Sequence, residues 1–158
     1  MANRIILNET SYFGPGAIQE IAHEVKNRRL KKVMVVTDQD LMKFKVATKI
    51  TELLEQNHID YKVYDKIKAN PTITNVQEGV AFCRKCGADV LVAVGGGSAI
   101  DTSKAIAIIM TNPEFADVRS LEGASPTKNR AMPIIAVSTT SGTAAEVTIN
   151  YVITDEEK

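Results

Sequence analysis

Three consecutive glycines, Gly95–Gly97, stand between an apolar run and a stretch of helical character. Because glycine has no Cβ, a ligand can approach its backbone closely and φ > 0 is allowed. Ser98 is a favourable N-cap, and Asp101 follows it at the spacing of a capping box. The helix expected from Ala99 to about Met110 would point its free N–H groups and its positive dipole end at the glycines. The pattern predicts a pyrophosphate site, and thus a nucleotide; the alternative is a glycine-rich turn in an ordinary α/β protein.

Two further polar signals follow apolar stretches. Asp38 comes directly after one such stretch, where its carboxylate could accept hydrogen bonds from both hydroxyls of an adenosine ribose. Its charge would also repel a 2′-phosphate, so it favours NAD over NADP; its alternative role is the N-cap of the next helix. Thr139, Thr140 and Thr143 group hydroxyls around Gly142 and suit hydrogen bonds to a phosphate or an amide. Ordinary turn and cap chemistry is the alternative for these threonines.

Apolar stretches alternate with helical spacing along the chain. Strands are expected at 33–37, 60–65, 90–94 and 134–137, and helices around 17–28, 46–54, 76–82 and 99–110. This alternation predicts an α/β fold with a doubly wound, mostly parallel, Rossmann-like sheet. Ligands bind such sheets at the carboxyl ends of the strands, where Asp38, the glycines and the threonines all fall. The acid precedes the glycines, so the usual order of the Rossmann motif is not met and a variant topology is expected.

The end of the sequence carries an alternating pattern. Val147, Ile149, Tyr151 and Ile153 are spaced as on a strand with one buried face, and the residues after Thr154 resemble a turn. We therefore predict a β-hairpin at one edge of the sheet, without its returning strand. Because an unpaired edge is a liability, we expect the chain to be the amino-terminal part of a longer protein or a deliberately cut domain. A short strand over 4–7, at an edge or swapped, and a long surface connection over 111–130 complete the expectation.

Length and charge limit the classes of protein. The 158 residues suit a single domain over 1–158, and 19 basic against 19 acidic residues leave no net charge. Nothing here favours a nucleic acid or an anionic membrane as partner. No apolar stretch is long enough to span a bilayer, and the amino terminus is too short and polar for a signal peptide. A cytoplasmic protein is expected.

No cluster of residues in the sequence suggests a metal site or a nucleophile. Cys83 and Cys86 form a C-x-x-C, but they fall at the end of a predicted helix, where the dipole does not activate a thiol. A zinc site would need further ligands, and His23 and His58 stand alone on predicted helices. Cysteines on an ordinary helix face are the favoured interpretation. We expect no catalytic residue and no metal ligand in this chain.

Several motifs together resemble the iron-containing (group III) alcohol dehydrogenases. The glycine motif with Asp101 and Lys104, and the threonine motif with Glu146, both match that family. Thr37–Asp38 and the Asn70-Pro71-Thr72 turn match it as well, and the resemblance extends through the whole sequence. The segment 112–123 resembles a branch of the family that acts on small diols. One departure is Ala99, where the family often has proline; a helix accepts either residue there.

The resemblance implies a dehydroquinate-synthase-like, NAD-binding amino-terminal domain. An all-helical second domain, absent from this sequence, would hold Fe²⁺ through Asp and His side chains. The whole protein would be an NAD-dependent dehydrogenase, and a homodimer, that interconverts a small alcohol or diol with its aldehyde. Carried onto this sequence, the cofactor-binding positions are Asp38, Asn70, Pro71, Gly95, Gly96, Gly97, Ser98, Asp101, Thr139, Thr140 and Thr143. Asp101 could serve the helix cap more than the ligand.

Two other functions stay open from the sequence. One is a polyol oxidoreductase of the glycerol dehydrogenase type, which would use zinc. The other is a nucleotide-binding module with no chemistry of its own. The predicted hairpin without a returning strand argues against such a module, because a domain that is stable on its own should pair or cover the edge of its sheet.

Overall fold

Four parallel strands form a single sheet in the order β2-β1-β3-β4. The computed structural model describes residues 8–157, so the strand predicted at 4–7 lies outside the described residues. The predicted parallel, doubly wound sheet is confirmed. Its strands are β1 Lys32–Val36, β2 Asp60–Tyr64, β3 Val90–Gly95 and β4 Ile134–Ser138.

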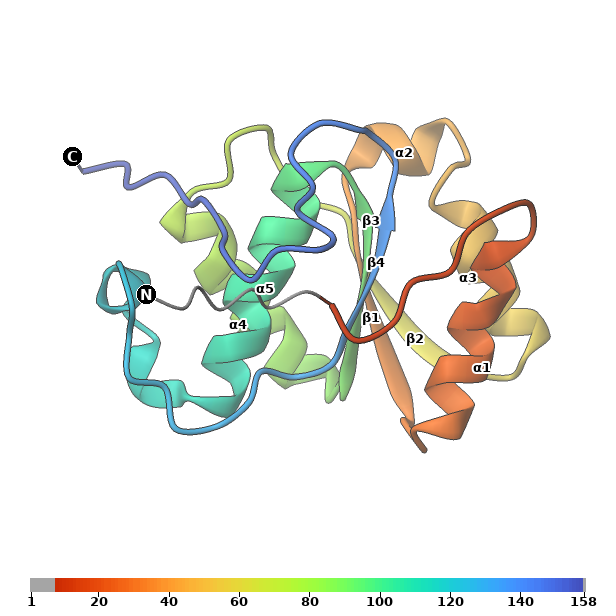
Figure 1. Cartoon of the computed structure of the whole chain (residues 1–158), viewed down its shortest axis with the longest axis horizontal. Helices are drawn as coiled ribbons and strands as arrows, with labels where there is room; N and C mark the ends of the chain where they lie inside the picture. The colour runs from red at the N-terminus through yellow and green to blue at the C-terminus, as the bar shows by residue number, and fades with distance from the viewer. Residues whose placement is uncertain (1–7, 158) are drawn as a thin grey trace, which may run out of the picture.

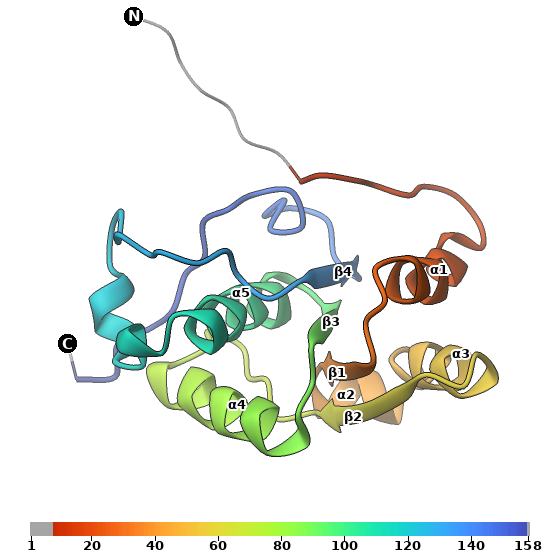
Figure 2. The same ribbon diagram turned by 90° about the horizontal axis from the view of Figure 1, so that it is seen from below.

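Helices cover both faces of this sheet, as Figures 1 and 2 show. The helices α1 and α3 pack on one face, and α4 and α5 pack on the other. The α-helices are α1 Glu20–Asn27, α2 Gln39–Lys43, α3 Thr48–Gln56, α4 Ile73–Cys86 and α5 Gly97–Thr111, and the 3₁₀ helices are η1 Ala17–Gln19, η2 Pro113–Phe115 and η3 Val118–Leu121. Within residues 8–157, no helix is both long and apolar enough to cross a membrane.

The central strands are apolar on both sides because each side meets a helix layer. Val33 and Val35 of β1 join the cluster beneath α1 and α3, whereas Met34 and Val36 join the cluster beneath α4 and α5. Every residue of β3 is buried. An uninterrupted apolar run is the expected signature of such a doubly covered parallel strand, and it is why the sequence pattern located these strands well.

The strand order reverses between β1 and β3. The chain runs from β1 outward to β2, then returns across β1 to form β3 and continues outward to β4. The connections that leave the carboxyl ends of β1 and β3 therefore diverge and open a crevice there. This edge lies uppermost in Figure 1, close to α2.

The two long helices of one layer begin differently. Thr72 is the N-cap of α4, with a capping box to Asn75. The cap predicted for α5 is wrong: its N-cap is Gly96, and Ser98 lies inside the first turn. The reason is that Gly95, the last residue of β3, turns the chain at φ 154°. The helix therefore begins earlier than expected, and no Ser98–Asp101 capping box forms.

The predicted strand over 146–153 and its hairpin are also wrong. The segment runs across α5 without forming a strand, as Figure 1 shows, and only Thr154 makes a bridge, with Thr72. The alternating apolar residues serve packing, because Tyr151 and Ile153 contact the cluster around α4 and α5. No strand of the described residues pairs with this segment, so side chains of α5 partner its backbone instead.

The connection over 111–130 is more ordered than predicted. Two short 3₁₀ helices, η2 and η3, interrupt it, and Val118 and Leu121 are buried against the core. Asn112 is fully buried, and its side-chain oxygen accepts hydrogen bonds from the backbone N–H groups of Lys128 and Asn129. A buried polar side chain that is fully bonded in this way fixes the course of a loop.

Candidate functional site

A cavity of about 1030 Å³ opens at the crevice between the ends of β1 and β3. Each of the three polar signals expected at this edge contributes to its wall. Its lining residues are 38–41, 65–69, Asn75, Glu78, 96–99, Thr139 and Thr140. This volume is at the upper end of the range for small-molecule sites in proteins, so it suits a large ligand such as a dinucleotide.

Neighbouring side chains lie so close to Gly95, Gly96 and Gly97 that these positions require glycine. A Cβ on Gly96 would lie 2.7 Å from Oγ1 of Thr140, and one on Gly97 would lie 3.1 Å from Oγ1 of Thr143. A Cβ on Gly95 would meet that of Ala99 at 2.8 Å. The glycine loop, residues 95–97, therefore allows the segment after β4 to lie directly over the start of α5.

The start of α5 is built to face an anion. The first helical hydrogen bond runs from the N–H of Ile100 to the carbonyl of Gly96. The N–H groups of Gly97, Ser98 and Ala99 precede this bond, and the glycine cap makes no side-chain hydrogen bond to them. These donors stand at the positive end of a helix of 15 residues. The arrangement suits a pyrophosphate held by backbone amides.

Asp38 caps α2 and also lines the cavity. Its Oδ1 accepts a hydrogen bond of 2.8 Å from the N–H of Leu41, which confirms the capping role considered for it. Asp38 is also one of the residues that line the cavity. Capping therefore does not exclude contact with a ligand, and the role at a ribose stays a prediction.

Thr139 and Thr140 form part of the cavity wall, and the segment 139–143 that they begin passes over the glycine loop. The N–H of Thr139 donates to the carbonyl of Gly95 at 3.0 Å, and Oγ of Ser138 donates to the carbonyl of Thr140 at 2.9 Å. The first bond extends the pairing of β3 and β4 by one residue, and the second fixes the turn that follows β4. The hydroxyls of Thr140 and Thr143 consequently come to the glycine loop, as the close approaches to its glycines show.

A family model supports what this geometry suggests. The model for iron-containing alcohol dehydrogenases matches residues 8–158, which is nearly the whole sequence. The chain belongs to the iron-containing alcohol dehydrogenase family. The expected resemblance is thereby confirmed.

Known members of this family are similar over the whole chain. Lactaldehyde reductase of Escherichia coli (strain K12) is 56% identical over 158 residues, which is 100% of this chain and 41% of that protein. An alcohol dehydrogenase structure from Oenococcus oeni has a TM-score of 0.91 at 39% identity, covering 98% of this chain and 40% of that one. The structure of NADH-dependent butanol dehydrogenase A from Thermotoga maritima has a TM-score of 0.85 at 30% identity, covering 99% and 39%. The chain thus spans about two fifths of the length of these relatives.

Five residues that the family resemblance implied at the cofactor do not line the cavity: Asn70, Pro71, Gly95, Asp101 and Thr143. Asn70 is exposed and adopts φ 54°, one residue beyond the lining. Pro71 is buried, and its carbonyl accepts a hydrogen bond of 2.8 Å from Thr154. Asp101 points to the carboxyl-terminal segment, where its Oδ2 accepts from the N–H of Val152 at 3.1 Å. Gly95 and Thr143 nevertheless adjoin lining residues of the glycine loop, whereas Asn70, Pro71 and Asp101 bond or lie elsewhere.

The loop between β2 and α4 is a part of the site that the sequence analysis missed. Residues 65–69 line the cavity together with Asn75 and Glu78 of α4. The available signal was positional, since β2 ends beside β1 at the same edge of the sheet. The loop carries Lys66 and Lys68 close to acidic residues of the cavity lining, so this part of the wall has charges of both signs. The apolar pattern of the sequence could not indicate this.

The cysteines behave as residues of an ordinary helix face. Both are free; Cys83 is fully buried, and burial raises the pKa of its thiol to about 12. A thiol that stays protonated is neither a nucleophile nor a metal ligand at neutral pH.

Residues 8–157 provide no set of ligands for the iron that the family name implies. Across residues 8–157, no group of three or more His, Cys, Asp and Glu side chains is placed to hold a metal ion. The residues at the crevice fit a dinucleotide but not a metal. That the iron ligands lie outside this chain stays a prediction.

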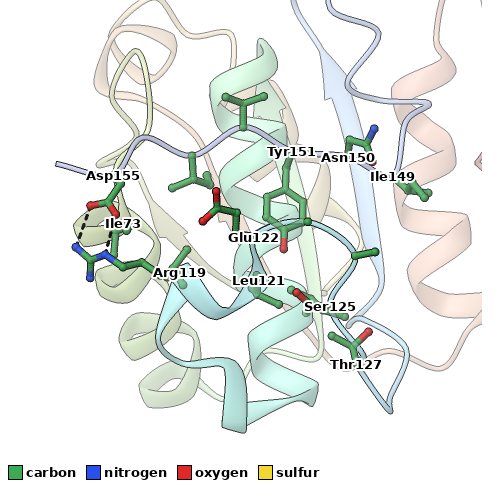
Figure 3. Close-up of a pocket in the computed structure, with 16 residues that line it drawn as sticks. Ile73, Arg119, Leu121, Glu122, Ser125, Thr127, Ile149, Asn150, Tyr151 and Asp155 are labelled. Carbon is green, nitrogen blue, oxygen red and sulfur yellow. Dashed lines mark hydrogen bonds and ion pairs between the residues drawn. The ribbon is translucent and has the colours of Figure 1, made fainter. Parts of the chain in front are cut away.

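A second cavity, of about 840 Å³, lies beneath the carboxyl-terminal segment (Figure 3). Its walls are the region around η3 and the residues 149–153. Arg119 closes one end, where Nε and Nη2 donate to the two oxygens of Asp155 at 2.8 and 2.9 Å. This two-point ion pair fixes the end of the segment against η3.

Proposed function

We propose that this chain is the NAD-binding portion of an iron-dependent oxidoreductase that interconverts a small alcohol or diol with its aldehyde. The observation that carries the proposal is the start of α5, whose first-turn N–H groups face the cavity at the reversal of strand order. Membership of the family supports the reaction class. The 56% identity to lactaldehyde reductase favours lactaldehyde and 1,2-propanediol as the substrate pair.

Different residues would bind different parts of the cofactor. The N–H groups of Gly97, Ser98 and Ala99 would hold the pyrophosphate, and Asp38 would accept hydrogen bonds from the adenosine ribose. Thr139 and Thr140 would donate hydroxyl hydrogen bonds from the opposite wall. Bound NAD supplies the hydride chemistry, while this chain orients it toward the substrate. The resemblance also supports a cytoplasmic homodimer.

No catalytic step is assigned to residues of this chain. Its described residues offer no metal site, so they bind and orient rather than activate an alcohol. We expect the isolated chain to be unable to reduce lactaldehyde even when iron is supplied. NADH-dependent turnover by the purified chain would contradict this division of labour.

A thermal-unfolding titration tests the proposal. NAD and ADP-ribose should both raise the unfolding temperature, because a ligand at 100 times its Kd adds about 2.7 kcal/mol of stability. NADP should raise it less, since its 2′-phosphate would face Asp38. The control ligand is nicotinamide mononucleotide, which lacks the adenosine and should have little effect. The absence of any shift with NAD at saturating concentration would overturn the proposal.

A further inference from the structure

Asp101 and Lys104 lie one helical turn apart on α5 and contact each other and the same extended segment. The Nζ of Lys104 lies 3.6 Å from Oδ1 of Asp101. It also donates to the backbone carbonyl of Asn150 at 2.7 Å and to Oγ1 of Thr148 at 3.2 Å. The Oδ2 of Asp101 accepts from the N–H of Val152 at 3.1 Å. Two side chains of one helix thus bond the segment 148–152 at three points.

This pair is shielded from solvent, unlike an ordinary surface ion pair. The side chains of Asp101 and Lys104 are only 16% and 13% exposed. Burial lowers the pKa of Lys104, while the neighbouring charges of Asp101 and Glu146 oppose that effect. Hydrogen bonds between charged groups and backbone are stronger than neutral ones. They hold a segment that has no strand partner among the described residues.

The segment 148–152, which Asp101 and Lys104 hold, follows closely after Thr139–Thr143, the threonine segment at the cavity. Between them lies Ala145, which is buried and packs in a small cluster with Ala93 of β3 and Ile100 of α5. The helix α5 therefore carries free amide donors at its start, which Gly96 caps. Further along the same helix, Asp101 and Lys104 hold the segment that follows the threonines. Thr139 is held to β3 by its own bond to Gly95, so release of segment 148–152 is expected to loosen Thr140 and Thr143, which approach the glycine loop.

We propose that Asp101 and Lys104 are positioning residues that clasp the segment 148–152 to α5 and thereby hold Thr140 and Thr143 over the glycine loop. Neither side chain contacts the cofactor. The consequence for binding rests on the proposed function, whereas the clasp itself does not. The assignment differs from the role that the family motif implied for Asp101, which was contact with the cofactor.

Hydrogen exchange without nucleotide tests the clasp in the full-length protein. In Asp101→Ala and in Lys104→Met, amides of 146–154 should exchange roughly tenfold faster, because a charge-assisted hydrogen bond is lost in each. Asp101→Asn keeps an oxygen for the N–H of Val152 and should restore slow exchange at that amide. Lys85→Met, on the exposed end of α4, is the matched control and should change nothing. Unchanged exchange in the two clasp variants would overturn the proposal.

Cofactor affinity provides a readout that a purely local packing role would not move. Asp101→Ala and Lys104→Met should raise the Kd and the KM for NAD several-fold with little change in kcat, and Asp101→Asn should recover most of the affinity. A Kd that rises in Asp101→Ala with unchanged exchange would mean direct contact with the cofactor, against the proposal. If exchange responds as expected but the unaltered protein binds no NAD, the proposed function fails and the clasp stands.

Discussion

At the scale of single residues, Gly96 offers the sharpest test of the glycine loop. Its backbone, at φ −85° and ψ −163°, suits any residue, so alanine there should fold normally. Its Cβ would nevertheless come within 2.7 Å of Oγ1 of Thr140 and push the threonine wall outward. We expect Gly96→Ala to weaken NAD binding roughly tenfold, or about 1.4 kcal/mol, with little change in unfolding temperature, as calorimetry and thermal unfolding would measure.

Gly123 provides the matched control for this substitution. It adopts φ +78°, a Cβ there would meet no atom within 4 Å, and it lines the second cavity rather than the crevice between β1 and β3. Gly123→Ala should therefore cost about 1 kcal/mol of stability through backbone strain alone and leave NAD affinity intact. Equal NAD affinity in Gly96→Ala and in the unaltered chain would place the pyrophosphate elsewhere.

The two roles of Asp38 can be separated by two substitutions. Asparagine is as good an N-cap as aspartate, so Asp38→Asn should keep the bond to Leu41 while removing the charge. We expect Asp38→Asn to lower the preference for NAD over NADP roughly tenfold, or about 1.4 kcal/mol, at unchanged stability. Asp38→Ala should show the same loss of preference and also lose about 1 kcal/mol of stability. An unchanged ratio of the two Kd values in both variants would leave Asp38 with its cap alone.

The environment of Cys83 makes a prediction about thiol chemistry. Burial raises its pKa to about 12, so at about pH 8 its thiol is protonated and the reactive thiolate is scarce. Cys86 is partly exposed, and its Sγ donates to the carbonyl of Cys83. Iodoacetamide should therefore label Cys86 and spare Cys83 in the folded chain, and label both after unfolding, as peptide mass analysis would show. Equal labelling in the folded chain would contradict the buried placement of Cys83.

At the scale of elements, the start of α4 distinguishes two neighbouring threonines. Thr72 and Thr74 are both residue types that can cap a helix, and the structure places Thr72 in a capping box with Asn75. Thr72→Ala should cost about 1 kcal/mol, measured by urea unfolding. Thr74, whose hydroxyl donates to the exposed Glu156, should cost less than about 0.5 kcal/mol when replaced by alanine. The reverse ranking would contradict the observed cap.

The success of the sequence analysis also differs from element to element. The strands β1 and β3 were predictable because an uninterrupted apolar run is characteristic of a strand buried on both faces. The partly exposed edge strand β4 carries a similar apolar run and was located by it. The segment 146–153 was mispredicted because alternation reports a half-buried face but not the partner of the backbone. The cap of α5 was mispredicted because the turn at Gly95 depends on a φ that the sequence permits without specifying it.

At the scale of the whole molecule, strand order decides where the site lies. Asp38, the glycine loop and Thr139–Thr140 could be grouped from the sequence because parallel strands share one carboxyl edge. Asp101 could not be assigned in the same way, since its partner Val152 is distant in sequence and pairs through backbone. The β2–α4 loop joined the site only once the order β2-β1-β3-β4 was known. The full set of residues that line the cavity therefore depends on the strand order and could not be deduced from sequence motifs alone.

A crystal structure of the chain with bound NAD tests this account most directly. We expect pyrophosphate oxygens within hydrogen-bond distance of the N–H groups of Gly97, Ser98 and Ala99, and the adenosine ribose beside Asp38. Asp101 should keep its bond to Val152 and stay clear of the nucleotide. Density for NAD in the cavity beneath residues 149–153, or no density for it at saturating concentration, would contradict the account.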